Sequence, residues 1–304
     1  MNMKFGYACI NLTLSAEGVI VNKGMIKKTF KSRGINYASV LALANIKSLE
    51  IIVDWNIENN FLFYRMSSGM FPWMSEYEIE DLPEINEIKT ILKRVGEKSK
   101  VAGLRLTYHP GPFHVLASPN KSTIENTLKG LSQHGQIMDF IGLPHSPYAK
   151  INIHVGGAYG DKKAAMNTFC ENYDKLPEHV KKRLTVENDD KANMYSIKDL
   201  LFIHQQIGVP LVFDFLHHLF CTGGFSIKEA FELAYDTWPE GITPVVHYSS
   251  PKKEFEDVSA PGPAHADFIY DVPPVFGKDV DIMFEAKAKE QAIMKYEKDF
   301  FARN

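Results

Sequence analysis

Short apolar runs alternate with amphipathic stretches along the whole chain, and this alternation constrains the fold more than any other feature. Eight runs of four to six residues are apolar enough to be buried strands. They span residues 5–9, 61–66, 103–108, 151–155, 183–187, 211–214, 244–247 and 281–285. Short, nearly continuous apolar runs are typical of parallel strands that are covered on both faces.

The segments between these runs have the period of a helix. Ile85, Ile88 and Ile91 recur every three residues, and similar spacing occurs in segments 124–131 and 197–207. The stretch 285–301 is rich in Ala, Lys and Glu and predicts a closing helix. Strands that alternate with helices indicate a parallel sheet, and eight of them predict closure into a (β/α)₈ TIM barrel. An open doubly wound sheet is the alternative, but it usually carries a G-x-G-x-x-G turn, which this chain lacks.

Nothing in the 304 residues marks a domain boundary. The proline-rich stretches 261–263 and 273–274 fall inside the connection between the last two predicted strands. We therefore predict one domain over residues 1–304, and a monomer. The scattered cysteines show no disulfide or zinc pattern, and no signal peptide or membrane span is apparent. These features predict an intracellular, cytoplasmic protein with no membrane partner, nuclear only if its source is eukaryotic.

Metal-type side chains lie where the predicted strands end, which is where the active sites of TIM barrels are found. The candidate ligands are His109, His154, Glu187, Asp214, His217, His247, His265 and Glu285. Glu76, after the second strand, is a candidate for a further ligand. Imidazole and carboxylate without thiolate suit Mn²⁺, Zn²⁺ or Fe²⁺, and the set is too large for one ion. We expect two or three ions.

The other histidines fit no such place, and we expect them to be structural or solvent-facing. They are His114, His134, His145, His179 and His204, together with His218, which neighbours a proposed ligand but should point away. A metal cluster of this kind commonly serves displacement at phosphorus. Metal-dependent sugar isomerases also use such barrels, so the cluster alone leaves the chemistry open.

The motifs around these residues are similar to those of the UV damage endonuclease family. The resemblance begins at FGYAC (5–9) and covers essentially the whole chain. Its specific pieces are YRMSS (64–68), HPG (109–111), HVGG (154–157), ENDD (187–190), FDFLHH (213–218), HYS (247–249), AHAD (264–267) and EAK (285–287). Each motif alone is weak, but their order and spacing together are specific.

The resemblance implies an enzyme that nicks damaged double-stranded DNA 5′ to UV photoproducts or other lesions, such as abasic sites. It implies a Mn²⁺-preferring cluster, with Zn²⁺ or Mg²⁺ as alternatives. It assigns metal-ligand roles to the eight residues named above and makes Glu187 the bridging carboxylate. Glu187, His109 and His247 are the expected catalytic residues. Tyr7 corresponds to a family residue at the edge of the DNA site.

Four positions depart from the family pattern. Glu76 stands where the family typically has His, and Pro112-Phe113 replace a Gln-Tyr pair that is implied to probe the damaged duplex. Val245 replaces a lysine that is modified to carry a carboxylate. These changes keep an alternative open, in which a metal-dependent TIM-barrel enzyme acts on a sugar or another small molecule.

A basic segment follows the first predicted strand. Lys23, Lys27, Lys28, Lys31 and Arg33 occur with no acidic residue between positions 18 and 49. DNA affinity comes mainly from phosphate contacts by such side chains. We expect this segment to form a loop at the active-site end and to contact DNA, together with Tyr7, Pro112 and Phe113. A solvated surface is the alternative.

Overall fold

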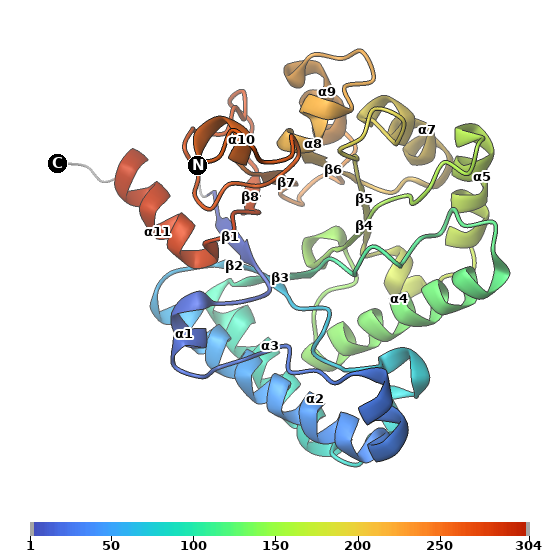
Figure 1. Cartoon of the computed structure of the whole chain (residues 1–304), viewed down its shortest axis with the longest axis vertical. Coiled ribbons are helices and arrows are strands. Elements are labelled where there is room, and N and C mark those ends of the chain that lie inside the picture. The colour runs from blue at the N-terminus through green and yellow to red at the C-terminus, as the bar shows by residue number, and fades with distance from the viewer. Residues whose placement is uncertain (1–2, 302–304) are drawn as a thin grey trace.

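Eight parallel strands close into a barrel in chain order in the computed structural model, which describes residues 3–301 (Figure 1). The strands are β1 (Phe5–Ala8), β2 (Phe63–Met66), β3 (Arg105–Tyr108), β4 (Ile151–Ile153), β5 (Leu184–Glu187), β6 (Leu211–Asp214), β7 (Val245–Tyr248) and β8 (Asp281–Phe284). Phe5 pairs with Ile282 and Gly6 with Met283, so the first and last strands join. The predicted TIM barrel is confirmed, and the open sheet is excluded.

The helices lie around the outside of the barrel (Figure 1). They are α1 (Leu12–Ala16), α2 (Lys27–Glu58), α3 (Ile85–Ala102), α4 (Lys121–Ile141), α5 (Lys162–Tyr173), α6 (Glu178–Lys181), α7 (Ile197–Ile207), α8 (Phe215–Phe220), α9 (Ile227–Tyr235), α10 (Lys252–Phe255) and α11 (Lys289–Phe300), with short 3₁₀ turns η1 (Met74–Glu76), η2 (Ile79–Asp81) and η3 (Pro147–Ala149). Local sequence sets their ends. Asn120 caps the start of α4, Gly142 ends it in a left-handed conformation, and Ser196 forms a capping box at α7.

Strand residues alternate between two apolar layers. Outward-facing side chains such as Tyr64, Leu106 and Phe213 join the main core between the sheet and the helices. Inside the barrel, a smaller apolar layer fills the space below the strand ends; it contains Ala8, Phe63, Val212, Trp238, Val245 and Met283. A Cβ on Gly6 would lie 2.6 Å from the Phe63 ring, so only glycine fits there. The barrel is therefore a packed core and has no open pore.

A buried ion pair closes the other end of the barrel. Arg105 Nη1 lies 2.8 Å from Asp281 Oδ2, and the same guanidinium donates to the carbonyls of Pro147, Tyr148 and Thr243. Both side chains are almost completely buried. This floor ties β3 and β8 to the loops below the sheet.

The long connection from β7 to β8 is ordered and contains the predicted proline-rich stretches. Its Glu256 carboxylate accepts from the backbone N–H groups of Asp267 and Phe268, and a β-bridge joins Pro251 to His265. His265 is therefore held at a fixed place near the barrel mouth.

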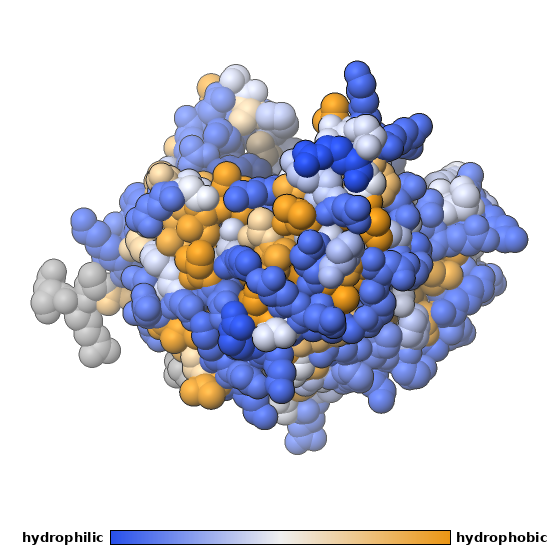
Figure 2. Space-filling model, turned by 90° about the horizontal axis from the view of Figure 1, so that it is seen from below, coloured by the Kyte–Doolittle hydropathy of each residue, from blue (hydrophilic) through white to orange (hydrophobic). Residues whose placement is uncertain are grey.

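The face of the molecule in Figure 2 is mainly polar. On the face in Figure 2, hydrophilic side chains surround smaller hydrophobic patches, as is usual for globular domains. None of the helices between residues 3 and 301 has the length and apolar character needed to cross a bilayer.

Candidate metal centre

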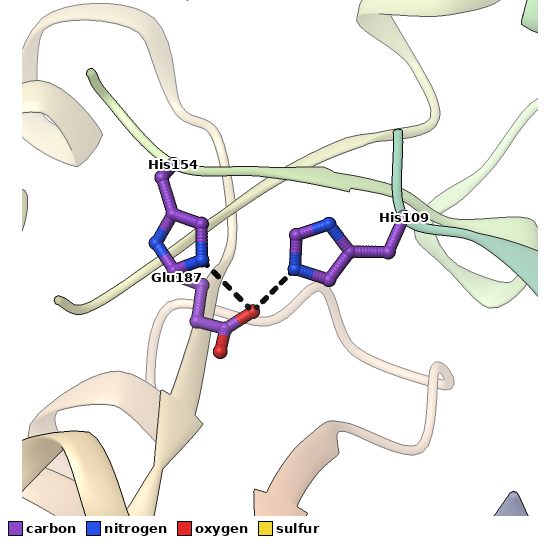
Figure 3. A group of neighbouring side chains, drawn as sticks. All are labelled: His109, His154 and Glu187. Carbon is purple, nitrogen blue, oxygen red and sulfur yellow. Dashed lines mark hydrogen bonds and ion pairs between the residues drawn. The ribbon is translucent and has the colours of Figure 1, made fainter. Parts of the chain in front are cut away.

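Glu187 lies at the centre of the strand-end residues. It ends β5 and is buried, and histidines from two neighbouring strand ends point toward it (Figure 3). His109 Nε2 lies 3.1 Å and His154 Nε2 lies 4.0 Å from Glu187 Oε2. His247 Nδ1 approaches the same oxygen at 3.1 Å. His217 Nδ1 lies 3.4 Å from the other oxygen, Glu187 Oε1. One carboxylate thus faces four imidazoles.

Three groups of potential ligands share this carboxylate. The first is His109, His154 and Glu187, the second is Glu187, Asp214 and His217, and the third is Glu187, His247 and Glu285. Within each group the ligand atoms lie within 4.8 Å of one another. The structure therefore brings together seven of the eight predicted ligands, in three groups that share one carboxylate.

The eighth predicted ligand lies beside this cluster, whereas the optional ninth does not. The His265 ring is 6.3 Å from the His217 ring, between centroids. Glu76 is exposed in η1 and belongs to none of the three groups found in residues 3–301. The remaining histidines also lie outside these groups, as predicted. His134, for example, is buried and contacts the Gly130 carbonyl at 2.7 Å.

Unpartnered polar atoms inside the cluster fit divalent cations. Within residues 3–301, Glu187 Oε1, Asp214 Oδ2 and His265 Nδ1 are buried and have no hydrogen-bond partner. Buried polar atoms are rarely left without a partner, because each one costs free energy. Oxygen and imidazole nitrogen donors without thiolate suit Mn²⁺ or Zn²⁺.

The Nδ1 atoms of three imidazoles lie close to acceptors. His109 Nδ1 lies 3.2 Å from the Pro110 carbonyl. His154 Nδ1 lies 3.1 Å from Asp189 Oδ1, although the two groups are not aligned as a hydrogen bond. His217 Nδ1 lies 2.9 Å from the Asn188 carbonyl and 3.4 Å from Glu187 Oε1. When an acceptor holds the proton on Nδ1, the lone pair of Nε2 is free for an ion.

Cationic groups balance the buried carboxylates. Arg65, on β2, forms a close ion pair with Glu285. Lys150 is completely buried, and its Nζ lies 3.2 Å from His247 Nε2. Burial lowers the pKa of Lys150 to about 7, against the opposing effect of Glu187.

The cluster shifts the pKa values of its own histidines in both directions. Burial lowers the pKa of His109 to about 4. Burial would also lower the pKa of His154, but Glu187 and Asp189 outweigh it and raise this pKa to about 9. Asp214 and Glu187 likewise overcome burial at His217 and raise its pKa to about 10.

The carboxylates of the cluster differ from one another as well. Burial raises the pKa of Asp214 to about 6. Burial also acts to raise the pKa of Glu187, but His247 and His154 hold it well below its usual range. The site thus holds one carboxyl that titrates near neutral pH beside one that stays ionised.

Sequence reasoning missed several side chains of the cluster: Arg65, Lys150, Asn152, Asn188 and Asp189. Asn152 donates to Glu187 Oε2, and Asn188 exchanges hydrogen bonds with the backbone of Asp214. The period of a strand could have found two of them. Lys150, Asn152 and His154 are spaced by two, so all three face the barrel interior.

The predicted DNA-contacting residues are divided between the rim and the core. Pro112 and Phe113 are exposed, with 86% of Phe113 accessible. Tyr7 is completely buried, because it faces outward from β1 into the helix layer, where its hydroxyl donates to Asn56. The predicted direct contact of Tyr7 with DNA does not agree with this burial.

The basic segment differs from its prediction in conformation. Lys23 lies in a loop, but Lys27, Lys28, Lys31 and Arg33 lie on the first turns of α2 and are exposed. Between residues 3 and 301, no carboxylate forms an ion pair with these five side chains. Their charge is therefore available to an external anion.

A cavity of about 590 Å³ adjoins the cluster between the loops after β3 and β4. His154 and Asp189 form its inner wall, and Phe113 and Tyr159 contribute aromatic rings. Tyr159 has a positive φ of 48°, and its ring covers Gly157, where a Cβ would lie 3.0 Å away. Left-handed backbone at a non-glycine residue is characteristic of functional sites.

The closed barrel and the histidine–carboxylate cluster at its strand ends place the chain among TIM-barrel proteins with a candidate multi-ion centre. The family model for UV-endonuclease UvdE matches residues 3–302. The UV DNA damage endonuclease of Bacillus thuringiensis subsp. konkukian is 32% identical, over 97% of this chain and 94% of the relative. The chain therefore belongs to the UV damage endonuclease family, a family of DNA repair nucleases.

Solved structures agree with this assignment. The crystal structure of SacUVDE matches with a TM-score of 0.84 and 29% identity, covering 98% of this chain and 99% of the other. A D-psicose 3-epimerase from Clostridium cellulolyticum has a TM-score of 0.55 at 10% identity, over 93% of this chain and 85% of the other. The second likeness shows the fold alone.

Proposed function

We propose that this protein is a metal-dependent endonuclease that cuts the backbone of damaged duplex DNA on the 5′ side of the lesion. UV photoproducts and abasic sites are the proposed lesions. The observation that carries the proposal is the sharing of Glu187 by three ligand groups. Family membership supplies the nuclease class. All eight proposed ligands come from one chain, which supports action as a monomer.

The proposed centre takes two or three divalent ions, with Mn²⁺ first and Zn²⁺ or Mg²⁺ as alternatives. The residues that would hold them are His109, His154, Glu187, Asp214, His217, His247, His265 and Glu285. Such ions activate water at neutral pH and neutralise charge on a phosphodiester.

The protein groups have separate tasks in this proposal. Glu187 is the shared carboxylate, and its low pKa keeps it ionised. His109, with a pKa of about 4, is neutral at physiological pH and keeps a free nitrogen lone pair. Asp214, with a pKa of about 6, is the carboxyl that can take up or release a proton near neutral pH. His247 Nδ1 contacts both Glu187 Oε2 and Glu285 Oε1, so this ring holds the two carboxylates in place relative to each other.

DNA binding in this proposal uses the rim of the barrel mouth. The unpaired cations at the start of α2 would contact phosphates. Phe113 and the cavity beside His154 would meet the damaged strand at the cluster. Pro112 and Phe113 lack the polar groups of Gln-Tyr, so sites that are already easy to open, such as abasic sites, should be cleaved best.

The small-molecule alternative has weaker support. The altered positions 112, 113 and 245 favour it, but the epimerase likeness at 10% identity shows only a shared fold. An exposed Phe113 and an unpaired cationic helix start also suit a polymer of phosphates better than a small sugar.

The decisive experiment is a nicking assay on three defined duplexes that contain one photoproduct, one abasic site or no damage, with and without Mn²⁺. We expect metal-dependent cuts 5′ to the lesion and none in undamaged DNA. Glu187→Gln should abolish cutting and lower bound metal by at least one ion per chain, with the circular dichroism spectrum unchanged. Full activity and metal content in this variant would contradict the proposed centre.

A further inference from the structure

Asp189 lies directly behind a candidate metal ligand, on the side away from Glu187. Its Oδ1 is 3.1 Å from His154 Nδ1, while the other nitrogen of that ring faces Glu187. Asp189 is buried, with 9% of its surface exposed. Burying a carboxylate costs free energy unless its oxygens are paired with a cation or accept hydrogen bonds.

The rest of Asp189 is held by Tyr195. The backbone N–H of Tyr195 donates to Asp189 Oδ2 at 3.2 Å, and the backbone N–H of Asp189 donates to the Tyr195 carbonyl at 2.9 Å. The Tyr195 hydroxyl in turn donates to the Gly157 carbonyl at 3.1 Å. Gly157 follows His154 by three residues. Asp189 and Tyr195 together therefore hold both the His154 ring and the loop that carries it.

We propose that Asp189 is a positioning residue that orients His154 as a metal ligand. The proposal rests on the metal centre proposed above and deepens it. The two groups are 3.1 Å apart but are not aligned as a hydrogen bond, and a small rotation of the ring or the carboxylate would align them. By then accepting the proton of Nδ1, Asp189 leaves the lone pair of Nε2 directed at the Glu187 side of the cluster. A carboxylate behind a ligating histidine fixes the ring and increases its basicity, and loss of such a partner typically weakens metal binding about 10- to 100-fold.

The neighbouring residues strengthen this interpretation. Glu187 is the shared carboxylate, the Asn188 carbonyl contacts His217 Nδ1 at 2.9 Å, and Asp189 contacts His154. Three consecutive residues at the end of β5 thus serve three parts of the cluster. Of these three residues, Asp189 is the one that places a carboxylate at the His154 nitrogen that faces away from Glu187.

Asparagine at position 189 gives a sharp test, because it cannot satisfy both of the present contacts. An amide oxygen that faces His154 would direct the NH₂ group at the Tyr195 N–H, which is also a donor. The reverse orientation would direct the NH₂ group at His154 Nδ1 and favour the tautomer with its proton on Nε2, the nitrogen needed for an ion.

The experiment measures Mn²⁺ binding by isothermal titration for wild type, Asp189→Asn, Asp189→Ala and His154→Asn, with Asp190→Asn as the matched control. Asp190 is partly exposed and belongs to none of the three ligand groups in the described part of the chain. We expect Asp189→Asn and Asp189→Ala to lower the Mn²⁺ affinity of one class of binding sites about 10- to 100-fold. Asp190→Asn should leave the Mn²⁺ affinity unchanged. His154→Asn should lose that class of ions entirely.

A spectroscopic readout separates positioning from general stability. In Zn²⁺-loaded, ¹⁵N-histidine-labelled wild type, the Nδ1 proton of His154 should give a slowly exchanging resonance, which is lost in both Asp189 variants although their fold is intact. Wild-type metal affinity in both Asp189 variants, with His154→Asn defective, would overturn the role of Asp189. Unchanged binding in His154→Asn itself would instead overturn the proposed metal centre.

Discussion

Protons compete with metal ions for single residues of the cluster. The pKa of His154 is raised to about 9 and that of His217 to about 10, because Glu187, Asp189 and Asp214 outweigh the effect of burial. Both rings are therefore protonated at neutral pH without metal, and the extra positive charge offsets the buried carboxylates. An ion must displace these protons before it can bind through either ring.

This competition gives a prediction for pH dependence. Below its pKa each histidine must release a proton, so the apparent affinity should rise about tenfold per pH unit for each proton displaced. The rise should span pH 6.5 to 8.5 and level off only as pH passes the two pKa values. Mn²⁺ titration calorimetry in buffers of different ionisation enthalpy would count the released protons. An affinity that is independent of pH would show that neither ring is a ligand.

At the scale of elements, the start of α2 is the strongest candidate for phosphate contact. Ile26 provides no side-chain cap, and the first turn has no acidic residue, so the free backbone N–H groups add to the lysine charges. Gly34, with a non-helical φ of 64° and ψ of −160°, interrupts α2 and separates residues 27–33 from the rest of the helix. Changing Lys27, Lys28 and Lys31 to Ala should weaken binding to every duplex alike. The slope of log affinity against log salt should fall by up to ~3 units if all three contact phosphates.

A matched triple variant controls for lost net charge. Lys175, Lys181 and Lys182 lie just before β5, at the opposite end of the barrel from the cluster. Their replacement by Ala should leave the salt slope unchanged. Fluorescence anisotropy with a labelled duplex at several salt concentrations measures the affinity and the salt slope of both triple variants. If both triple variants changed the salt slope equally, the α2 segment would be a solvated surface that makes no specific phosphate contacts.

The loop after β3 is the element in which lesion choice should be encoded. Restoring Pro112→Gln and Phe113→Tyr supplies polar groups that can reach exposed base edges, so the cleavage rate on a defined photoproduct should rise. Cleavage at an abasic site should change less. Photoproduct cleavage that is already fast in wild type, and equal in the double variant, would show that these positions do not select the lesion.

Val245 differs from Pro112 and Phe113 because its side chain is buried. It is completely buried in the inner apolar layer beside Phe63, Val212 and Met283, and the amine of Lys150 already lies beneath His247. A lysine at 245 would place a second cation in this apolar space, and we expect Val245→Lys to lower stability.

The sequence predicted elements better than side-chain directions. All eight strands were found with ends within two residues, because buried parallel strands are short apolar runs between helical periods. Seven of the eight candidate ligands lie together because strand ends converge in a barrel. Lys150 was missed because it precedes β4 and only the carboxyl ends were searched, and Arg65 was missed because only His, Asp and Glu were sought at those ends. Tyr7 was expected at the DNA site but lies in the helix layer, because successive residues of a strand face opposite sides of the sheet.

At the scale of the whole molecule, the barrel interior is a column of layers. The Arg105–Asp281 pair forms the floor, an apolar layer follows, and the metal-ligand cluster lies at the mouth. Because the floor is sealed and the inner layer is packed, the cluster is approached from the mouth. The separation also predicts that the floor contributes to stability and the mouth to chemistry.

Breaking the floor tests this division. Arg105→Met would leave Asp281 as a buried, unpaired charge and three carbonyls without their donor, so it should cost about 3–5 kcal/mol of unfolding free energy. The double variant Arg105→Met with Asp281→Asn removes the stranded charge and should recover part of that loss. Arg94→Met, which breaks an exposed pair with Glu50, is the control and should change stability little. Urea unfolding with saturating Mn²⁺ measures all three, and Mn²⁺ affinity in the folded variants should match wild type. A floor variant as stable as Arg94→Met, or one that loses metal while folded, would show that floor and mouth are not separate.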